Sequence, residues 1–294
     1  MTTLALGLIE TRSLDALLAD GPPSLAACAE RLGWPFVPLG LGARTIGRLH
    51  LGSEFCETLL STEAALRHAL ARSRDAGLGF ALVTPILSDA GLSRLSSLLP
   101  LLPDGTEVVA NDWGTLRRVG RMRPDLIPVA GRLLCKLIKD PRLPSSEWAR
   151  LYPHGLHSGP FGAMLDRLGA ARIEMDVPPF ADLRDFRSTT VKVSVHAPYG
   201  FSVKGRSCRI GSLAQPPEAK FTAGQDCRRD CLIYVGGLSR PETGAADLPT
   251  FQRGNTLFYR HSDAMLETVA AAMAEGWVDR LVLTGDWNEN RRTH

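Results

Sequence analysis

The sequence lacks a hydrophobic run that could cross a membrane, because none of its apolar stretches approaches about 18 uninterrupted residues. It also lacks the start of a secretory signal peptide. The N-terminal stretch MTTLALGLIETRSLDALL has no basic segment at its beginning, and Glu10 and Arg12 interrupt its apolar run. We therefore expect a cytoplasmic protein without a transmembrane segment.

The sequence also has little excess of positive or negative charge, and it has few aromatic side chains. The 294 residues carry 34 Lys and Arg against 31 Asp and Glu, a net charge of +3, and only 6% of the residues are aromatic. Recognition of RNA bases calls for a basic face that carries aromatic rings for stacking. The composition therefore argues against nucleic acid as a partner and places a small-molecule substrate ahead of it.

Two kinds of motif are missing. No GxGxxG follows the first apolar strand, so a dinucleotide-binding fold is not indicated. The metalloprotease motif HExxH and the serine-nucleophile motif GxSxG are absent as well. The sequence therefore shows no hydrolytic machinery.

The pattern that is present alternates short apolar strands with amphipathic helices along almost the whole chain. Strands are expected at residues 3–9, 49–52, 79–87, 107–110, 126–130, 171–177 and 281–284, and in the stretch that begins at Val191. Eight strands close a (β/α)8 barrel of the TIM type. We expect a single α/β barrel domain over residues 1–294, with a cysteine-bearing excursion after the seventh strand. An open doubly wound sheet is the alternative.

The excursions are expected at about residues 200–235 and 236–256, which interrupt the alternating pattern. Both contain segments rich in Pro, Gly and charge. Such composition is typical of loops rather than of barrel strands or helices. We interpret them as additions to the barrel and not as a separate domain.

The chain has six cysteines. In the cytosol they are not expected to form three disulfides, so metal binding, catalysis and burial remain as their roles. Cys28 stands in the helical run Leu25–Ala29, and a free cysteine in such a run is most often buried. We expect Cys28 to be a core residue.

Three cysteines fall in one stretch, residues 191–235, as Cys208 followed by the pair Cys227-x-x-x-Cys231. Cationic side chains flank them, and these are Lys204, Arg206, Arg209, Arg228 and Arg229. Thiols near positive charge lose their protons more easily, and the thiolate is the form that binds metal. The stretch therefore predicts three ligands of a metal centre.

Cys56 is the expected fourth ligand. It follows the second strand, whereas Cys208 follows the seventh, and the carboxyl ends of all barrel strands meet at one rim. Cys135, after the fifth strand, meets the same criterion less closely. Four thiolates suit a tetrahedral zinc site or a [4Fe–4S] cluster. One short pair with scattered single cysteines favours the cluster. A zinc site, or cysteines that bind no metal, remain as alternatives.

The segment from Ser194 to Cys208, SVHAPYGFSVKGRSC, resembles the signature of the collagenase-like, unassigned-type peptidase family (family U-thirty-two). The first cysteine of that signature is absent here, near Tyr199. Together with the Cys-x-x-x-Cys pair and the segment LGSEFC at residues 51–56, this makes the chain similar to the UbiV branch of the family.

That resemblance implies a [4Fe–4S] protein that acts with a UbiU-like paralogue as a heteromer. The implied activity is the oxygen-independent hydroxylation of a quinone precursor in ubiquinone biosynthesis. The implied ligands are Cys56, Cys208, Cys227 and Cys231. Within the family, peptidase activity and hydroxylation of RNA bases are alternatives, and so is a subunit that binds the cluster without catalysis.

Several polar residues stand at or just after expected strand ends, where barrel enzymes place their chemistry. They are Asp112, Arg132, Lys136, Glu174, Asp176, His196 and Asp286. Helix capping and solvated loop charge are the alternative interpretation of each. Taken together, they predict a lined pocket on one rim. Glu174 and Asp176 are two residues apart and therefore share one face of a strand.

Two further expectations concern histidines and the partner. His154 and His157 have no carboxylate partner close in sequence, so a histidine metal site there is not expected. A hydrophobic patch for the paralogous subunit is expected near residues 236–253.

Overall fold

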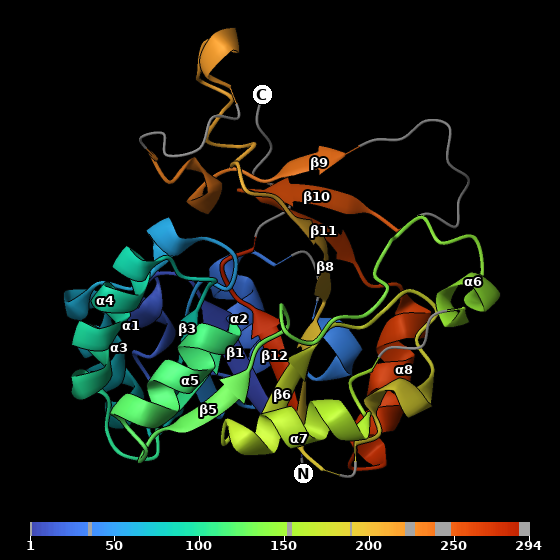
Figure 1. The fold of residues 1–294 in the computed structure, drawn as a ribbon, viewed down its shortest axis with the longest axis horizontal. Coiled ribbons are helices and arrows are strands. Elements are labelled where there is room, and N and C mark those ends of the chain that lie inside the picture. The colour runs from blue at the N-terminus through green and yellow to red at the C-terminus, as the bar shows by residue number, and fades with distance from the viewer. Residues whose placement is uncertain are drawn as a thin grey trace.

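Eight parallel strands form a closed barrel in the computed structural model, which describes residues 2–34, 37–151, 155–188, 190–220, 227–238 and 248–287 (Figure 1). Around the barrel the strands follow the order β1-β12-β7-β6-β5-β4-β3-β2. Their bounds are β1 Thr3–Leu8, β2 Arg48–Gly52, β3 Gly79–Thr84, β4 Glu107–Ala110, β5 Ile127–Ala130, β6 Arg172–Met175, β7 Lys192–Ala197 and β12 Arg280–Thr284. The expected TIM-type (β/α)8 barrel is confirmed, and the doubly wound sheet is excluded.

Helices cover the outside of the barrel, except for the short α6, which has no buried residue and lies off to one side (Figure 1). They are α1 Leu14–Leu17, α2 Leu25–Leu32, α3 Glu63–Asp75, α4 Asp89–Leu98, α5 Trp113–Met122, α6 Ser146–Arg150, α7 Gly159–Arg167 and α8 Asp263–Ala274. Short 3-10 turns lie at η1 Pro38–Gly40, η2 Glu57–Leu59, η3 Leu99–Leu101, η4 Leu183–Phe186, η5 Pro217–Ala219 and η6 Asp230–Leu232. None of the helices in the described ranges is long and apolar enough to span a membrane.

Local sequence explains where these helices begin and end. The side chains of Ser24, Thr62 and Ser262 each accept a hydrogen bond from a backbone N–H in the first turn of the helix that follows. Such caps satisfy donors that have no partner within the helix. Helix α2 ends at Gly33, which adopts φ +68°, a conformation that favours glycine.

A second sheet lies over the carboxyl ends of the barrel strands, on the side away from the N-terminus (Figure 1). Its antiparallel strands are β8 Tyr199–Lys204, β9 Gly236–Leu238, β10 Thr250–Arg253 and β11 Thr256–Arg260, in the order β8-β11-β10-β9. The sequence predicted excursions at this place but not their pairing into a sheet. Residues 221–226 and 239–247 of the excursions lie outside the described residues.

The opposite, amino-terminal end of the barrel is filled by charged side chains from alternate strands. Glu107 of β4 accepts hydrogen bonds from Arg280 of β12 (Nη2 to Oε1, 2.9 Å), and Arg48 of β2 lies 3.2 Å from the same oxygen. Arg172 of β6 pairs with Asp279. Burial alone would raise the pKa of Glu107, but the arginines outweigh it and lower the pKa. This network closes one end, so the open end is the rim beneath the second sheet.

Candidate functional site

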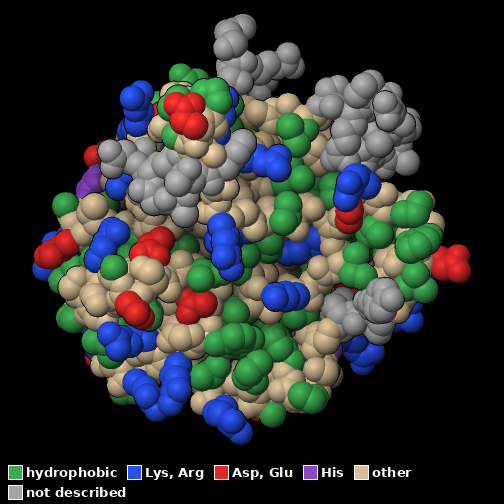
Figure 2. Space-filling view, turned by 45° about the horizontal axis from the view of Figure 1, so that its top comes forward, with side chains coloured by type: hydrophobic (Ala, Val, Ile, Leu, Met, Phe, Trp, Pro, Cys, Tyr) green, Lys and Arg blue, Asp and Glu red, His purple; other side chains and the backbone are tan. Residues whose placement is uncertain are grey.

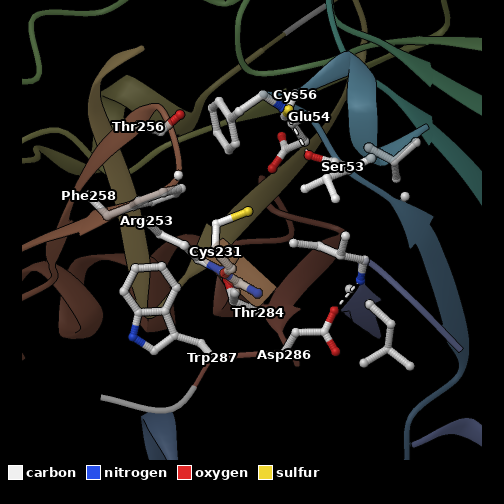
Figure 3. A pocket seen from close by; sticks show the side chains of 18 of the residues that line it. Ser53, Glu54, Cys56, Cys231, Arg253, Thr256, Phe258, Thr284, Asp286 and Trp287 are labelled. Atoms are coloured by element: carbon white, nitrogen blue, oxygen red, sulfur yellow. Dashed lines mark hydrogen bonds between the residues drawn. The ribbon is translucent and has the colours of Figure 1, made fainter. Parts of the chain in front are cut away.

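A cavity of about 100 Å³ lies between the barrel mouth and the second sheet. The ends of β1, β2, β7 and β12 border it from below, and the turn between β10 and β11 borders it from the side. Figure 3 shows this cavity, with Glu54 and Cys56 on one wall and Arg253 and Trp287 on another. Residues from opposite ends of the chain therefore meet here, as the convergence of strand ends requires.

Four thiols line this cavity, and they come from three separate segments. Cys56 follows β2, Cys208 follows β8, and Cys227 and Cys231 precede β9. Sγ of Cys208 accepts a hydrogen bond from the N–H of Gly211 at 3.2 Å, and Sγ of Cys227 accepts one from the N–H of Arg229 at 3.4 Å. Cys231 is buried, Cys56 and Cys208 are half-buried, and Cys227 is exposed. The four cysteines expected as ligands thus border one space.

The backbone at Gly254, in the turn between β10 and β11, lies close to two of these thiols. It has φ +59°, and a Cβ on it would lie 3.3 Å from Cβ of Cys231 and 3.6 Å from its Sγ. Sγ of Cys208 would be 4.0 Å away. Only glycine takes this backbone conformation without strain and leaves room beside the sulfurs. The turn therefore forms a close-fitting wall of the thiol site.

The environment of the thiols differs from the sequence-based expectation. Burial raises the pKa of Cys231 to about 12, although Arg253 lowers it in part, and burial also raises the pKa of Cys208. Nε of Arg253 donates to the backbone oxygen of Cys231 at 3.0 Å. The expected acidifying cations Arg206, Arg209, Arg228 and Arg229 are exposed instead. For Cys208 and Cys231 the expected acidification is not seen, because the flanking arginines reach solvent, where water screens their charge, and burial dominates.

The other two cysteines lie in the hydrophobic core. Cys28 is fully buried in α2, and burial raises its pKa to about 11. Cys135 is also fully buried, and its Sγ contacts the backbone oxygen of Ala130 at 3.9 Å. Burial raises its pKa strongly. Neither borders the cavity that the other four line.

Below the thiols, Arg132 joins two carboxylates. Its Nη1 lies 2.7 Å from Oδ1 of Asp176, and its Nε donates to Oε1 of Glu54 at 2.8 Å. Nζ of Lys139 lies 2.7 Å from the other oxygen of Asp176. Burial alone would raise the pKa of Asp176, but Lys139 and Arg132 outweigh it and lower the pKa to about 2. These groups form a buried ionic network at the ends of β2, β5 and β6.

A second polar group lies beside this network. Nε2 of His196 on β7 lies 2.8 Å from Oε2 of Glu174 on β6, and Nδ1 of His50 on β2 lies 3.4 Å from Oε1 of the same carboxylate. Burial lowers the pKa of His50 to about 3 in spite of that neighbour, so its ring is neutral. Burial alone would raise the pKa of Glu174, but His196 and His50 outweigh it and lower the pKa to about 2.

Aromatic rings connect the second sheet to the barrel and form an apolar wall of the cavity. Phe55 packs edge-on against Phe201 and Phe258, with ring centroids 5.0 and 5.2 Å apart. Trp287, after β12, stacks on Tyr199 at 4.3 Å. Edge-on and stacked rings attract each other beyond their burial. Of these rings, Phe55, Phe258 and Trp287 border the cavity directly.

The structure brings together four of the polar residues expected at the rim, namely Arg132, Glu174, Asp176 and His196. Asp112 lies elsewhere and caps α5, accepting from the N–H of Thr115 at 2.7 Å. Lys136 is exposed, and the neighbouring Lys139 takes the buried position. The expectation that Asp112 and Lys136 line a pocket is corrected, because capping and the course of the loop after β5 direct them away.

The remaining expected residues have simpler roles. Asp286 borders the cavity and accepts a hydrogen bond from the N–H of Ile9, and burial raises its pKa to about 6. His154 lies outside the described residues, and Nε2 of His157 lies 2.9 Å from the backbone oxygen of Asp185.

Sequence reasoning did not single out Glu54, His50, Lys139 or Arg253. Glu54 stands two residues before Cys56, in a turn that Gly52 makes possible: Gly52 has φ +130°, and a Cβ there would collide with the backbone oxygen of Val83. A carboxylate beside an expected ligand is the signal that would have identified Glu54. His50 lies inside an apolar strand, and nothing local distinguishes it from a core residue.

Comparison with known proteins gives a likeness of fold. No protein-family model matches the sequence, and no curated protein matches it. The structure titled "The Structure of the U32 Peptidase Mk0906" has a TM-score of 0.42 and 12% identity over 97% of this chain and 92% of that one.

Two further solved structures are similarly distant. The spore cortex-lytic enzyme SleL of Bacillus megaterium QM B1551 has a TM-score of 0.43 at 9% identity, covering 99% of this chain and 72% of that one. The family 18 N-acetylglucosaminidase of Paenibacillus barengoltzii has a TM-score of 0.39 at 9% identity, covering 99% and 97%. Similarity at this distance assigns no activity to this chain.

Proposed function

We propose that Cys56, Cys208, Cys227 and Cys231 hold a [4Fe–4S] cluster, and that the protein assists an oxygen-independent hydroxylation of a small aromatic quinone precursor. A UbiU-like paralogue is the proposed partner. The observation that carries this proposal is the meeting of four thiols from three segments around one cavity that also has an aromatic wall and a polar floor.

The donor set fits a cluster better than a zinc ion. A tetrahedral zinc site holds its sulfurs about 3.8 Å apart, as its Zn–S bonds require. Among the described residues, no three cysteine sulfurs lie within 4.8 Å of one another. Thiolates that each bind a separate iron of a cubane need a wider spacing. The close wall that Gly254 forms against Cys231 and Cys208 shapes the space between the sulfurs.

Charge supports the same assignment. A [4Fe–4S]2+ core with four thiolates has a net charge of about −2. Arg253 is only 7% exposed and its backbone-bound guanidinium lies against Cys231. A buried cation beside the thiols offsets negative charge at that place and lowers the cost of burying it.

When bound, such a cluster supplies one-electron transfer. The chain's own residues provide the walls of the binding site. Phe55, Phe258 and Trp287 border the cavity and give it an apolar wall against which an aromatic ring can be placed. His196 borders the cavity, and its Nε2 lies 2.8 Å from Oε2 of Glu174.

Iron and sulfide analysis, with electron paramagnetic resonance, on anaerobically purified protein tests the cluster. About four irons and four sulfides per chain are expected. A deletion strain grown without oxygen tests the pathway and should lack ubiquinone. Protein with zinc and no sulfide would contradict the cluster, and normal quinone in the deletion strain would contradict the pathway.

A further inference from the structure

Three potential metal ligands gather on the floor of the cavity, apart from the thiols. A carboxylate oxygen of Glu54, one of Glu174 and a ring nitrogen of His196 all lie within 4.8 Å of one another. Nε2 of His196 is 2.8 Å from Oε2 of Glu174 and 3.9 Å from Oε1 of Glu54. The three side chains come from the ends of β2, β6 and β7, so the barrel itself holds them in place.

Polar atoms at this place are buried without hydrogen-bond partners. Oε1 of Glu174 is one of them, and both ring nitrogens of His50 are others. Glu174 is fully buried and His50 is 1% exposed. Nδ1 of His50 points at Glu174, 3.4 Å from Oε1. Leaving such atoms unpaired costs about 1–3 kcal/mol each, and native proteins rarely tolerate it. The site therefore holds oxygen and nitrogen atoms that could bind a ligand and that have no hydrogen-bond partner among the described residues.

The local charge is also unbalanced. Among the described residues, Arg132 and Lys139 are the permanent cations that contact the carboxylates of Glu54 and Asp176. Arg280 acts on Glu174 from farther away and is itself paired with Glu107. The group is left with one negative charge, which lies on the Glu174 side because Arg132 and Lys139 contact the other two carboxylates. Buried charge of this kind is stabilised by a cation.

We propose that Glu54, Glu174 and His196 bind a divalent transition-metal ion. The ion would replace the proton that His196 now shares with Glu174. Two carboxylates and one imidazole form a donor set that suits Mn²⁺ or Fe²⁺. Arg132 already donates to Glu54, and His50 faces Glu174, so both carboxylates have the outer partners that metal-binding side chains usually have.

The place of this metal site at the floor of the cavity would let the ion contact a ligand. Glu54 and His196 border the cavity, while Glu174 lies beneath it. A metal ion there is open to a ligand in the cavity and would polarise a substrate oxygen as a Lewis acid. This site shares no residue with the four thiols, so it stands whether or not a cluster is present.

Titration of the full-length protein with Mn²⁺, followed by electron paramagnetic resonance, tests the site. Mn²⁺ prefers oxygen and imidazole to thiolate, so the cysteines compete little. One Mn²⁺ per chain is expected, in iron-free and in iron-loaded protein. Its spin-echo spectrum should show coupling to an imidazole nitrogen. Glu174→Gln and His196→Gln should each weaken binding roughly 100-fold, and His50→Asn roughly 10-fold.

Two control variants define the outcome. Glu57→Gln makes the same chemical change outside the site, where Glu57 contacts Ser88, and should bind Mn²⁺ as the wild type does. Cys208→Ala should also retain it, which separates this site from the thiols. Wild-type protein that binds no Mn²⁺, or binds it without nitrogen coupling, overturns the proposal even if the variants fail to fold. Binding that is lost in Cys208→Ala but kept in Glu174→Gln overturns it as well.

Discussion

Nη1 of Arg132 lies 2.7 Å from Oδ1 of Asp176, although 44 residues separate them in the sequence. The same guanidinium reaches back 78 residues to Glu54. One buried side chain therefore ties the ends of β2, β5 and β6 together beneath the cavity. One oxygen that it holds, Oε1 of Glu54, lies 3.9 Å from Nε2 of His196.

Arg132→Met should destabilise the fold by about 3–5 kcal/mol, because it leaves Glu54 and Asp176 with uncompensated buried charge. Urea unfolding followed by circular dichroism measures the change. Arg142→Met is the matched control, because Arg142 pairs with Asp140 at the surface and is 64% exposed. That pair should contribute less than about 1 kcal/mol. Equal losses in the two variants would show that the Arg132 network does not stabilise the barrel mouth.

Single Cys→Ala changes should divide the six cysteines into two groups. Replacement of Cys56, Cys208, Cys227 or Cys231 should remove most of the iron and the absorbance near about 400 nm that thiolate-bound clusters show. Cys28→Ala and Cys135→Ala should keep both, since these thiols lie in the core away from the cavity. If Cys56→Ala keeps four irons while Cys135→Ala loses them, the fourth ligand is wrongly assigned.

Gly254→Ala should lower cluster occupancy. The added methyl group would lie 3.3 Å from Cβ of Cys231, in a backbone with φ +59°. An alanine in that conformation costs on the order of 1 kcal/mol, and the turn must also move away from the sulfur. Iron per chain after anaerobic reconstitution measures the effect. Gly237→Ala is the control, because no atom lies within 4 Å of its added Cβ. Equal iron content in both variants would contradict the close-fitting wall.

The loss of folding stability at acid pH should depend on His261. This side chain is buried, and burial lowers its pKa from 6.5 to about 3. Below pH 6.5 the unfolded chain therefore binds a proton that the folded chain does not, so stability falls as the pH falls from about 6.5 to about 3. Above pH 6.5 both states are neutral at this residue, and it contributes no slope.

His261→Leu should reduce the slope of the unfolding free energy against pH by the contribution of one proton, about 1.4 kcal/mol per pH unit. The free energy of unfolding measured at intervals from pH 7 to pH 4 gives the slope. His68→Leu is the control, since His68 is half-exposed, 2.9 Å from Asp15 on the surface. An unchanged slope in His261→Leu would mean that the buried ring is protonated or reaches water.

A heteromer with a UbiU-like chain should use the second sheet. Val203 on β8 is 56% exposed and Leu238 on β9 is 43% exposed, and both border one surface hollow. Figure 2, which turns this end of the molecule forward, shows apolar side chains interspersed with basic and acidic ones. Apolar side chains exposed together are typical of an interface.

Co-expression followed by size-exclusion chromatography should give a stable heteromer, and Val203→Asp should weaken it. Met122→Asp, at the end of α5, replaces an apolar residue that is 42% exposed and lies away from the second sheet, and it should leave the heteromer intact. A monomer at micromolar concentration in the presence of the partner would contradict the interface.

The sequence by itself determined the barrel. Strands and helices differ in the period of their apolar residues, and caps such as Ser24 and Thr62 act over three residues. Both signals are local, so they can be recognised without the fold. Closure of the barrel then places all strand ends on one rim, which is why Cys56 could be matched with Cys208 across most of the chain. Glu174 and Asp176 followed from the same alternation along β6.

Tertiary structure decided what each polar side chain does at that rim. Lys139 rather than Lys136 became buried because the loop after β5 turns toward Asp176, and no local pattern encodes that turn. His50 acquired a role only when β2 and β6 faced each other across the barrel. Burial raises the pKa of Cys208 and Cys231, and that burial depends on segments that are distant in sequence. Long-range electrostatics and desolvation arise from packing, so they could not be read from the order of residues.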